Sequence, residues 1–285
     1  MLERRSDILG ALFRQRQTVS DRHFDQLASH FARKIYASPK GAIRLAVLTR
    51  DLQEWLTELP GSRPLKVLDV GAGLGHISEW LLQRGHHLTV SEPSAEMLDA
   101  ARTRLQAVAL QPGQTLAFLP LALQQLPARG EQYDLVICHA VLEWLAQPAQ
   151  AIALLRELVV ADGAVSLAFY NRDALIYKNL IKGQFRKLQR NQLAGEGKRS
   201  LTPQQPLDPR AVHDWIGQAG FDCAQQTGVR VFHDYIPEPF KSEADEQQVI
   251  EQELLYSRHP AYLHLGRYLH CWLRPASSGP DATTR

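Results

Sequence analysis

The strongest constraint on the fold is a change of pattern near residue 65, where short apolar runs begin to alternate with segments of helical spacing. Five of these runs have the length and composition of buried strands: 65–70, 86–92, 115–123, 133–140 and 164–171. The segments of helical spacing lie at 76–85, 95–108 and 142–159. Strands that alternate with helices predict a parallel sheet with right-handed crossovers. We therefore expect an α/β fold with a mostly parallel, doubly wound sheet.

Local signals set two boundaries in this pattern. Ser94 is a residue type that caps helices, so it is expected to start the helix over 95–108. Asp162 and Gly163 form a turn-type pair, which predicts that the fifth strand begins after them.

The alternation is interrupted after the fifth strand and then resumes. Asp208 as N-cap, a proline at the first helical position and Gly220 as the stop predict a helix. The runs 221–236 and 264–275 are typical of two late strands, and a polar helical segment over 242–258 separates them.

The N-terminal region has a different character. Its apolar residues Phe24, Leu27, Phe31 and Ile35 have helical spacing, and a second helix is expected up to the break at Pro60 and Gly61. These patterns divide the chain as follows: a disordered or additional extension over 1–20, an N-terminal helical cap over 21–60, the main domain over 61–275 with a basic insert at 171–207, and a disordered tail over 276–285.

Composition excludes several classes of protein. The chain has 285 residues, and no apolar run reaches the length of about 18 residues that spans a membrane. The N-terminus lacks the pattern of a secretory signal. The three cysteines have no metal-ligand spacing among themselves or with the histidines. We expect a cytoplasmic protein with no membrane partner and no metal.

The distribution of charge is more informative than the net charge of +2. Residues 171–207 hold eight Lys or Arg against two Asp or Glu, whereas residues 51–170 hold seven against thirteen. A basic segment is often only a solvated face. The alternative is a polyanionic partner such as a nucleic acid.

A glycine-rich turn follows the first strand of the alternating region. Gly71, Gly73 and Gly75 give G-x-G-x-G, and His76 stands where the dinucleotide fingerprint has its third glycine, which weakens a nicotinamide or flavin assignment. Residues without a Cβ allow a ligand to approach the backbone. Asp69, at the end of the strand, places a carboxylate beside the turn.

Three further residues follow the ends of the later strands. Glu92 ends the second strand, near the offset of about 20 residues at which an acid accepts hydrogen bonds from ribose hydroxyls. Leu123, at the end of the third strand, is placed to wall an adenine. His139, at the end of the fourth, is placed either as a buried structural histidine or at the reacting group.

The pattern "LDVGAGLG" resembles the first motif of class I S-adenosylmethionine methyltransferases. Together with "RHFDQLASHFARKIYASPKGAIR", "CHAVLEWLAQP", "AFYN", "TGVRVFHDY" and "LGRYLH", the chain resembles the bacterial tRNA 5-carboxymethoxyuridine methyltransferases from about residue 21 to residue 273. The resemblance implies that S-adenosylmethionine is the cofactor. The implied cofactor contacts, taken with the acid and glycine read from the turn, are Arg44, Asp69, Gly71, Ala72, Gly73, Glu92, Leu123 and His139. Two positions depart from the family pattern, since Ala72 replaces a glycine and Glu92 replaces a shorter aspartate.

The resemblance also implies a reaction. A methyl group passes to the carboxylate of a modified wobble uridine in tRNA and gives a methyl ester. An ionised carboxylate is already nucleophilic and needs no general base. A cation is needed to hold it, and Arg230 is the candidate, with His233 and Tyr235 as helpers.

The basic insert is the candidate surface for RNA phosphates. Its predicted contacts are Lys182, Arg186, Lys187, Arg190, Lys198 and Arg199. Phe185 and Tyr177 are available to stack on unpaired bases. Other functions remain open at this level: a methyltransferase for a small carboxylic acid or phenol, a non-catalytic tRNA-binding protein, and a nicotinamide oxidoreductase.

Overall fold

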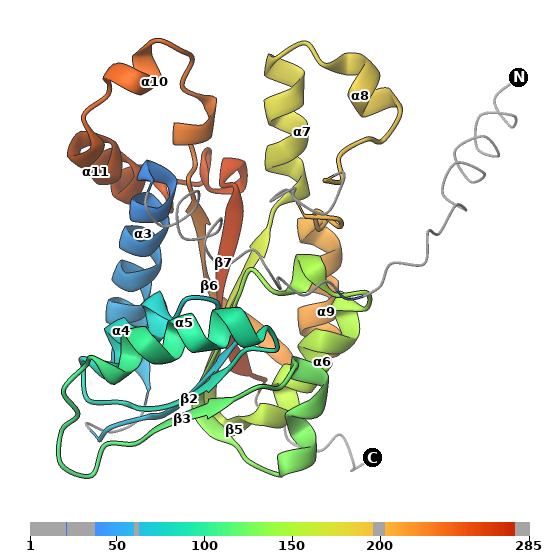
Figure 1. The fold of residues 1–285 in the computed structure, drawn as a ribbon. Helices are drawn as coiled ribbons and strands as arrows, with labels where there is room; N and C mark the ends of the chain where they lie inside the picture. The colour runs from blue at the N-terminus through green and yellow to red at the C-terminus, as the bar shows by residue number, and fades with distance from the viewer. Residues whose placement is uncertain (1–20, 22–37, 60–62, 196–202, 277–285) are drawn as a thin grey trace, which may run out of the picture.

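The computed structural model describes residue 21 and residues 38–59, 63–195 and 203–276, and a seven-stranded sheet lies at its centre (Figure 1). The strand order is β3-β2-β1-β4-β5-β7-β6. The strands are β1 (Lys66–Val70), β2 (His87–Ser91), β3 (Leu116–Leu119), β4 (Tyr133–His139), β5 (Val159–Tyr170), β6 (Phe221–Val229) and β7 (Tyr268–Pro275). Strand β7 runs antiparallel to both β5 and β6, and the pairs among β1 to β5 are parallel. The expected mostly parallel sheet is therefore confirmed.

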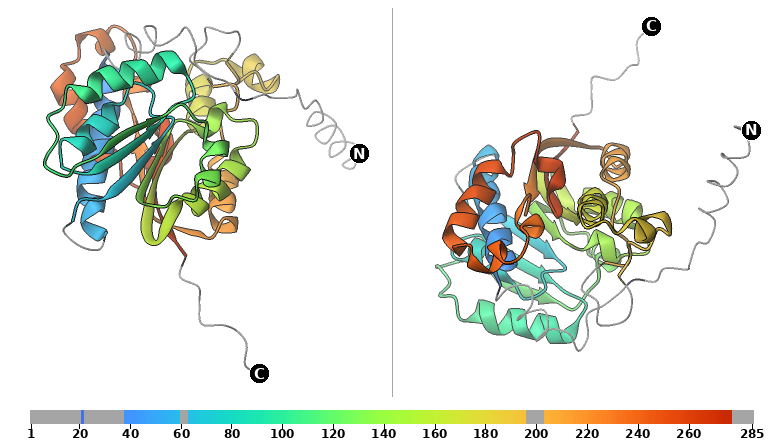
Figure 2. Two further views of the ribbon diagram at one scale, coloured as in Figure 1. Left: turned by 60° about the horizontal axis from the view of Figure 1, so that its bottom comes forward. Right: turned by 90° about the horizontal axis from the view of Figure 1, so that it is seen from above.

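Helices cover both faces of this sheet (Figure 2). The α-helices are α3 (Pro39–Trp55), α4 (His76–Leu82), α5 (Ala95–Gln106), α6 (Pro148–Leu158), α7 (Arg172–Ile181), α8 (Phe185–Gln189), α9 (Pro209–Gln218), α10 (Phe240–Glu243) and α11 (Glu246–Tyr256). Short 3-10 helices are η2 (Leu56–Glu58), η3 (Leu123–Gln125), η4 (Pro127–Arg129), η5 (Leu142–Trp144), η6 (His233–Tyr235) and η7 (Leu263–Leu265). The apolar residues of α6 and α9 belong to one buried cluster, and those of α3, α4 and α5 belong to clusters on the other face. This arrangement is doubly wound.

The capping residues behave as their chemistry predicts. The hydroxyl of Ser94 accepts a hydrogen bond from the Met97 N–H at the start of α5, and the Asp208 carboxylate accepts one from the Arg210 N–H at the start of α9. Gly220 follows α9 with a positive φ of 75°, which a glycine adopts without strain.

Three strand boundaries differ from the expectation. The third strand ends at Leu119, so Leu123 begins η3 instead of ending a strand. Strand β5 begins at Val159, and the Asp162–Gly163 pair lies within it, because the pairing with β4 jumps from Tyr133–Val159 to Leu135–Ala164. Strand β6 ends at Val229, and the next residues turn away into η6.

Several expectations fall on residues outside the described ranges. These are the extension over 1–20, the helix around 24–35 and most of the tail after 276. Within the described residues, no helix combines the length and the apolar character that crossing a bilayer requires. The part of the chain that the structure describes also contains no group of three or more His, Cys, Asp or Glu side chains that could hold a metal ion.

Two pairs of helices extend the molecule beyond one end of the sheet. Helices α7 and α8 rise on one side of this end, and α10 and α11 rise on the other (Figure 1). Asn171 fixes the start of α7, because its side-chain oxygen accepts from the Asp173 N–H and its amide donates to the carbonyls of His264 and Gly266. The insert therefore leaves β5 at the edge where open parallel sheets bind ligands.

Candidate active site

The glycine turn joins β1 to α4 in a left-handed backbone conformation. Gly71, Gly73 and Gly75 have φ values of 62°, 57° and 75°. A Cβ at Gly71 would lie 2.6 Å from the Val141 Cγ2, whereas one at Gly73 would meet only the Met97 Sδ at 4.0 Å. The backbone at Gly71 is thus packed against Val141, whereas among the described residues only the Met97 Sδ comes within 4 Å of a Cβ at Gly73.

Two buried acids flank this turn. Asp69 accepts a hydrogen bond from the Ser78 hydroxyl at 2.6 Å, and burial raises the pKa of its carboxyl to about 7. Glu92 accepts from the N–H groups of Gly73 and Ser94, both at 3.0 Å. The additional methylene of Glu92 therefore lets one carboxylate hold both the turn and the start of α5.

Arg44 reaches the site from α3. Its side chain is buried, and its guanidinium lies 5.0 Å from the ring centroid of Tyr268, at the start of β7. The positive charge of Arg44 favours the ionised forms of both Asp69 and Glu143. The arginine predicted from the second helix therefore does lie close to the acids of the turn.

Glu143 is a site residue that the sequence analysis did not single out. It is fully buried in η5, and no side chain among the described residues donates to its carboxylate, which only the backbone N–H groups of Glu143 itself and Tyr170 approach. Burial raises the pKa of its carboxyl to about 7, and the charge of Arg44 offsets only part of this effect. The sequence pattern that could have identified Glu143 is "AVLEWL", where an acid interrupts an apolar run directly after a strand.

His139 ends β4 and belongs to a buried chain of hydrogen bonds. Its Nε2 lies 2.8 Å from the Ser166 hydroxyl, which lies 2.7 Å from the His270 Nε2. The His270 Nδ1 lies 2.8 Å from the Asp51 carboxylate. Burial lowers the pKa of both histidines below 6.5, so both rings are neutral.

The charge on Asp51 determines which group donates and which accepts in each of these hydrogen bonds. Burial raises the pKa of Asp51, but the hydrogen bond with His270 and the nearby arginines outweigh it and lower the pKa to about 2. An ionised Asp51 only accepts, so His270 carries its proton on Nδ1 and accepts from Ser166 through Nε2. We therefore assign the His139 proton to Nε2. The His139 Nδ1 is left as a buried acceptor with no partner among the described residues.

Arg230 lies after β6, and its guanidinium lies 5.6 Å from the ring centroid of Tyr268, the ring that Arg44 also approaches. Its φ of 61° is unusual for a residue with a side chain, and its guanidinium lies 3.2 Å from the Asp234 carboxylate. Arg267, which the sequence analysis did not select, lies 2.8 Å from the same carboxylate. Burial raises the pKa of Asp234, but Arg230 and Arg267 hold it well below its usual range. Two arginines thus share one carboxylate, and one positive charge remains in excess.

The predicted helpers of Arg230 have different surroundings. The N–H groups of Val231 and His233 donate to the buried Glu253 carboxylate at 2.7 and 2.8 Å, which fixes the segment after Arg230. The His233 Nδ1 is buried and lies 3.8 Å from the Asp234 carboxylate. The Tyr235 hydroxyl lies 2.7 Å from the Leu265 carbonyl, so it joins two loops and is not free for a ligand.

The remaining predicted residues divide between core and surface. Leu123 is buried and belongs to the main hydrophobic cluster. Ala72 is half-buried, and its N–H donates to the Ser91 carbonyl at 3.2 Å. Four cations of the insert are exposed on and beside α7 and α8: Lys182, Arg186, Lys187 and Arg190. Lys198 and Arg199 lie outside the described residues.

Comparison with known proteins adds independent information. A family model described as a methyltransferase domain matches residues 68–165. A tRNA 5-carboxymethoxyuridine methyltransferase of Escherichia coli K12 is 36% identical over 261 residues, which cover 91% of this chain and 98% of that protein. A ubiquinone biosynthesis O-methyltransferase of Aeromonas salmonicida is 30% identical over 46% of this chain and 54% of its own.

The fold of this chain is similar to that of a solved methyltransferase structure. The magnesium protoporphyrin IX methyltransferase of Synechocystis PCC 6803, with SAH bound, superposes with a TM-score of 0.55 at 24% identity. The match covers 72% of this chain and 89% of the other. The methyltransferase type of α/β fold is therefore confirmed.

Proposed function

We propose that this chain, which belongs to the tRNA 5-carboxymethoxyuridine methyltransferase family, methylates the carboxylate of 5-carboxymethoxyuridine at the wobble position of tRNA. The observation that carries the proposal is identity of 36% over 91% of this chain and 98% of that relative. A tRNA substrate would place the reaction in the cytoplasm.

The proposed cofactor is S-adenosylmethionine, and the groups around the turn fit it. The open face at Gly73 leaves room for a ligand against the backbone. Glu92 lies at the end of β2, where it is placed to accept from ribose hydroxyls. The His139 Nδ1 has no hydrogen-bond partner among the described residues, and no side chain among them donates to the Glu143 carboxylate, so both groups can accept from a ligand. An ammonium group and an adenine amine are suitable donors.

The residues of the chain then have distinct tasks. S-adenosylmethionine supplies an electrophilic methyl group when bound, and a carboxylate oxygen of the substrate accepts it. Arg44 is placed to hold the carboxylate of the cofactor, and we propose that Glu143 accepts from the neighbouring ammonium. No side chain has to remove a proton, because the substrate acid is ionised at neutral pH. Positioning is therefore the main contribution of the protein.

Arg230 is the proposed contact of the substrate carboxylate. Asp234 neutralises only one of the two arginines beside it, so an anion can bind at the remaining charge. The left-handed backbone of Arg230 is a strained conformation that the surrounding contacts maintain, and such strain is often found at functional sites. The exposed cations of the insert are proposed to contact tRNA phosphates.

Mass spectrometry of tRNA nucleosides tests the function. Deletion of the gene should convert the methyl ester of 5-carboxymethoxyuridine to the free acid. Purified protein with S-adenosylmethionine should restore the ester on tRNA from the deletion strain. An unchanged ester level in a strain without a second such enzyme would contradict the proposal. Methylation of a small carboxylic acid or phenol with tRNA left unmodified would favour the alternative enzyme.

Matched variants distinguish the proposed roles of Arg230 and Arg44. Arg230→Ala should lower methyl transfer to tRNA far more than it lowers affinity for S-adenosylmethionine, and Arg44→Ala should mainly weaken binding of the cofactor. Isothermal titration with the cofactor and steady-state kinetics with tRNA measure the two effects. If Arg230→Ala weakens only cofactor binding, the two arginines have been assigned to the wrong ligands.

A further inference from the structure

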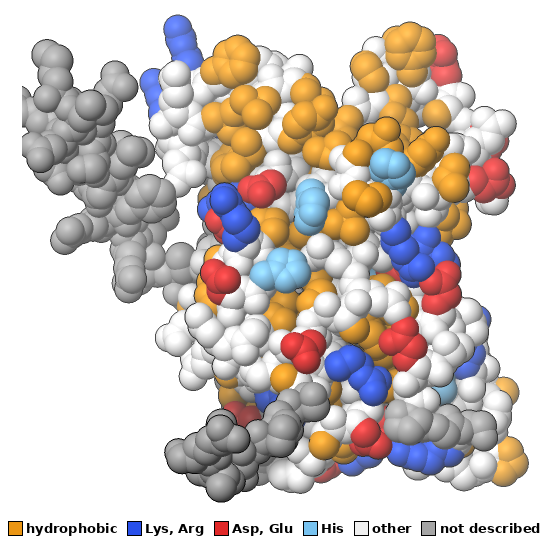
Figure 3. All heavy atoms as spheres, turned by 180° about the vertical axis from the view of Figure 1, so that it is seen from behind, with side chains coloured by type: hydrophobic (Ala, Val, Ile, Leu, Met, Phe, Trp, Pro, Cys, Tyr) orange, Lys and Arg blue, Asp and Glu red, His pale blue; other side chains and the backbone are white. Residues whose placement is uncertain are grey.

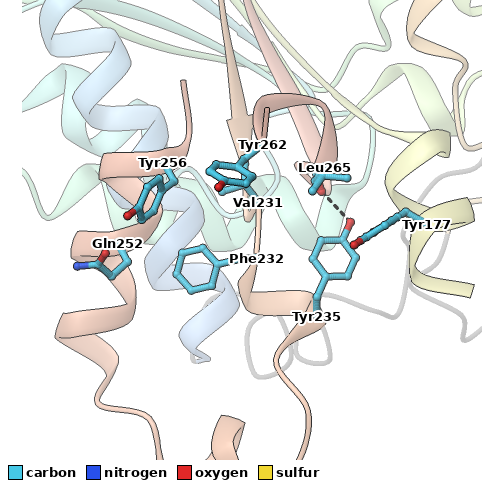
Figure 4. Close-up of a pocket in the computed structure, with 8 residues that line it drawn as sticks. All are labelled: Tyr177, Val231, Phe232, Tyr235, Gln252, Tyr256, Tyr262 and Leu265. Atoms are coloured by element: carbon cyan, nitrogen blue, oxygen red, sulfur yellow. Dashed lines mark hydrogen bonds between the residues drawn. The ribbon is translucent and has the colours of Figure 1, made fainter. Parts of the chain in front are cut away.

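A cavity of about 470 Å³ opens between α7, η6, α11 and η7 (Figure 4). It is lined by Tyr177, Val231, Phe232, Tyr235, Gln252, Tyr256, Tyr262 and Leu265. Tyr235, and Tyr177 as a residue available for stacking on bases, were also singled out in the sequence, whereas none of the predicted cofactor contacts lines the pocket. Its volume lies within the range of about 300 to 1,000 Å³ that is usual for small-ligand sites. We call it the aromatic pocket.

The aromatic rings are arranged in two pairs. Tyr177 and Tyr235 meet edge to face with centroids 5.2 Å apart, and Tyr256 and Tyr262 do so at 5.5 Å. Figure 4 shows the pairs on opposite sides of the pocket, with Phe232 between them. Tyr177, Tyr256 and Tyr262 each keep between 38% and 43% of their surface exposed. The pocket thus presents aromatic faces that the described residues do not cover. On the rear view of Figure 3, hydrophobic side chains likewise gather on both upper lobes and between them.

The floor of the pocket is held rigidly. Glu253 accepts hydrogen bonds from the N–H groups of Val231, Phe232 and His233, which fixes the backbone that carries the Phe232 ring. The hydroxyl of Tyr235 is bound to the Leu265 carbonyl, so its ring, not its hydroxyl, is available. A pocket with a fixed shape is suited to a flat, rigid ligand.

The chemistry of the lining and its surroundings defines the ligand. None of the described residues that line the pocket is charged, and their polar groups are tyrosine hydroxyls and the Gln252 amide, which both donates and accepts. Cations stand beside it: Lys178 follows Tyr177 on α7, and the Lys241 ammonium donates to the His233 carbonyl. The lining suits a planar ring with polar edges, and the surroundings suit an attached anionic chain. A nucleobase on a phosphate backbone has these properties.

We propose that the aromatic pocket binds an unstacked base of the tRNA anticodon loop, next to the uridine that is methylated. This inference rests on the proposed function. The modified uridine itself has to reach the groups around His139 and Glu143, which do not line the pocket. Arg230 directly precedes Val231 in the pocket wall, so a base bound here lies close to the nucleotide whose carboxylate Arg230 holds.

A fluorescent anticodon stem-loop tests the inference. The RNA carries 5-carboxymethoxyuridine at the wobble position and 2-aminopurine at an adjacent position, whose fluorescence falls when it stacks on an aromatic ring. The variants are Tyr262→Ala and Phe232→Leu. The control is Leu255→Ala, because Leu255 is exposed on α11 but does not line the pocket. Thermal unfolding and S-adenosylmethionine titration confirm that each variant is folded.

The expected results distinguish a failure of the pocket inference from a failure of the proposed function. Binding to the parent and the control should quench the fluorescence, and Tyr262→Ala should abolish the quenching and weaken RNA binding about 5- to 150-fold. If all variants bind and methylate the RNA as the parent does, the pocket inference is wrong and the proposed function stands. If the parent neither binds nor methylates the RNA, the proposed function fails and the inference falls with it. If the variants affect only a small acid or phenol, the pocket is a small-substrate site.

Discussion

The two sides of the sheet, meaning strands β3-β2-β1-β4 and strands β5-β7-β6, differ in the sign of the charge that is in excess beside them. Beside β1, β2 and β4, three buried acids gather near one cation: Asp69, Glu92 and Glu143 near Arg44. Beside β5, β7 and β6, the buried Arg267 and the half-buried Arg230 share the carboxylate of Asp234. The first side has an excess of acceptors and suits a ligand rich in donors and positive charge. The second has an excess of positive charge and suits an anion, so the cofactor and the substrate carboxylate are expected to meet near Tyr268, whose ring both Arg44 and Arg230 approach.

The largest expected effect comes from removing the shared carboxylate. Asp234→Asn leaves Arg230 and the buried Arg267 without a counter-charge and should lower the free energy of unfolding by about 3 to 5 kcal/mol. Urea denaturation measures this loss. Because the folded-state pKa of Asp234 is lowered, its contribution is present above the unfolded pKa of about 3.9 and is lost as the pH falls below it.

The control for this variant is an exposed ion pair. Asp99 pairs with Arg102 on the surface of α5, and Asp99→Asn should change the free energy of unfolding by less than about 1 kcal/mol. Equal losses in Asp234→Asn and Asp99→Asn would remove the contrast between the two sides.

A smaller change in the free energy of unfolding, of the opposite sign, is expected for Glu143, on the side of the sheet with the excess of acids. The folded-state pKa of Glu143 is raised to about 7, so this carboxyl makes the protein less stable as the pH rises from about 4.5 to 7. Glu143→Gln should therefore raise the free energy of unfolding at pH 8 by up to about 3 kcal/mol, and by almost nothing at pH 4. Thermal unfolding across this pH range measures the change. Affinity for S-adenosylmethionine should fall in the same variant, and a stabilised variant with unchanged affinity would refute the ligand role of Glu143.

The glycine turn sharpens the comparison further. Gly71→Ala places a Cβ 2.6 Å from the Val141 side chain and should lower the free energy of unfolding by about 1 to 3 kcal/mol. Gly73→Ala meets no such neighbour, so it should cost only about 1 kcal/mol of backbone strain while it weakens cofactor binding. Thermal unfolding of both variants measures the loss of stability from packing and strain, and calorimetric titration measures the loss of cofactor affinity. Undiminished affinity in Gly73→Ala would show that no ligand approaches this part of the backbone.

The smallest effect on stability belongs to the exposed insert. Replacing Arg186, Lys187 and Arg190 with Ala should change the free energy of unfolding by less than about 0.5 kcal/mol per residue. It should raise the KM for tRNA and flatten the salt dependence by a log-log slope of about 0.7 for each phosphate that the variant no longer neutralises. Affinity for S-adenosylmethionine should not change. If tRNA affinity and its salt slope match those of the parent, RNA does not contact this surface.

The two sides also differ in how far the sequence predicts them. The glycine turn, Asp69 and Glu92 follow strand ends within one short stretch, so local patterns placed them together. Arg267 escaped notice because its partner Asp234 is 33 residues away and only the return of β7 beside β6 joins them. The boundary of β5 was misplaced for a related reason, since an irregular pairing with β4 absorbs the Asp162–Gly163 pair. Contacts across the sheet decide such features, and local periodicity does not encode them.

Helix α11 contacts both sides at once. Glu253 binds the backbone after Arg230, and the adjacent Leu254 carbonyl accepts from Arg50 on α3, the helix that also carries Arg44 and Asp51. A ligand that orders one of these segments against α11 lowers the entropic cost of ordering the other. Cofactor and tRNA are therefore expected to bind cooperatively, and linkage requires that each raises the affinity of the other by the same factor.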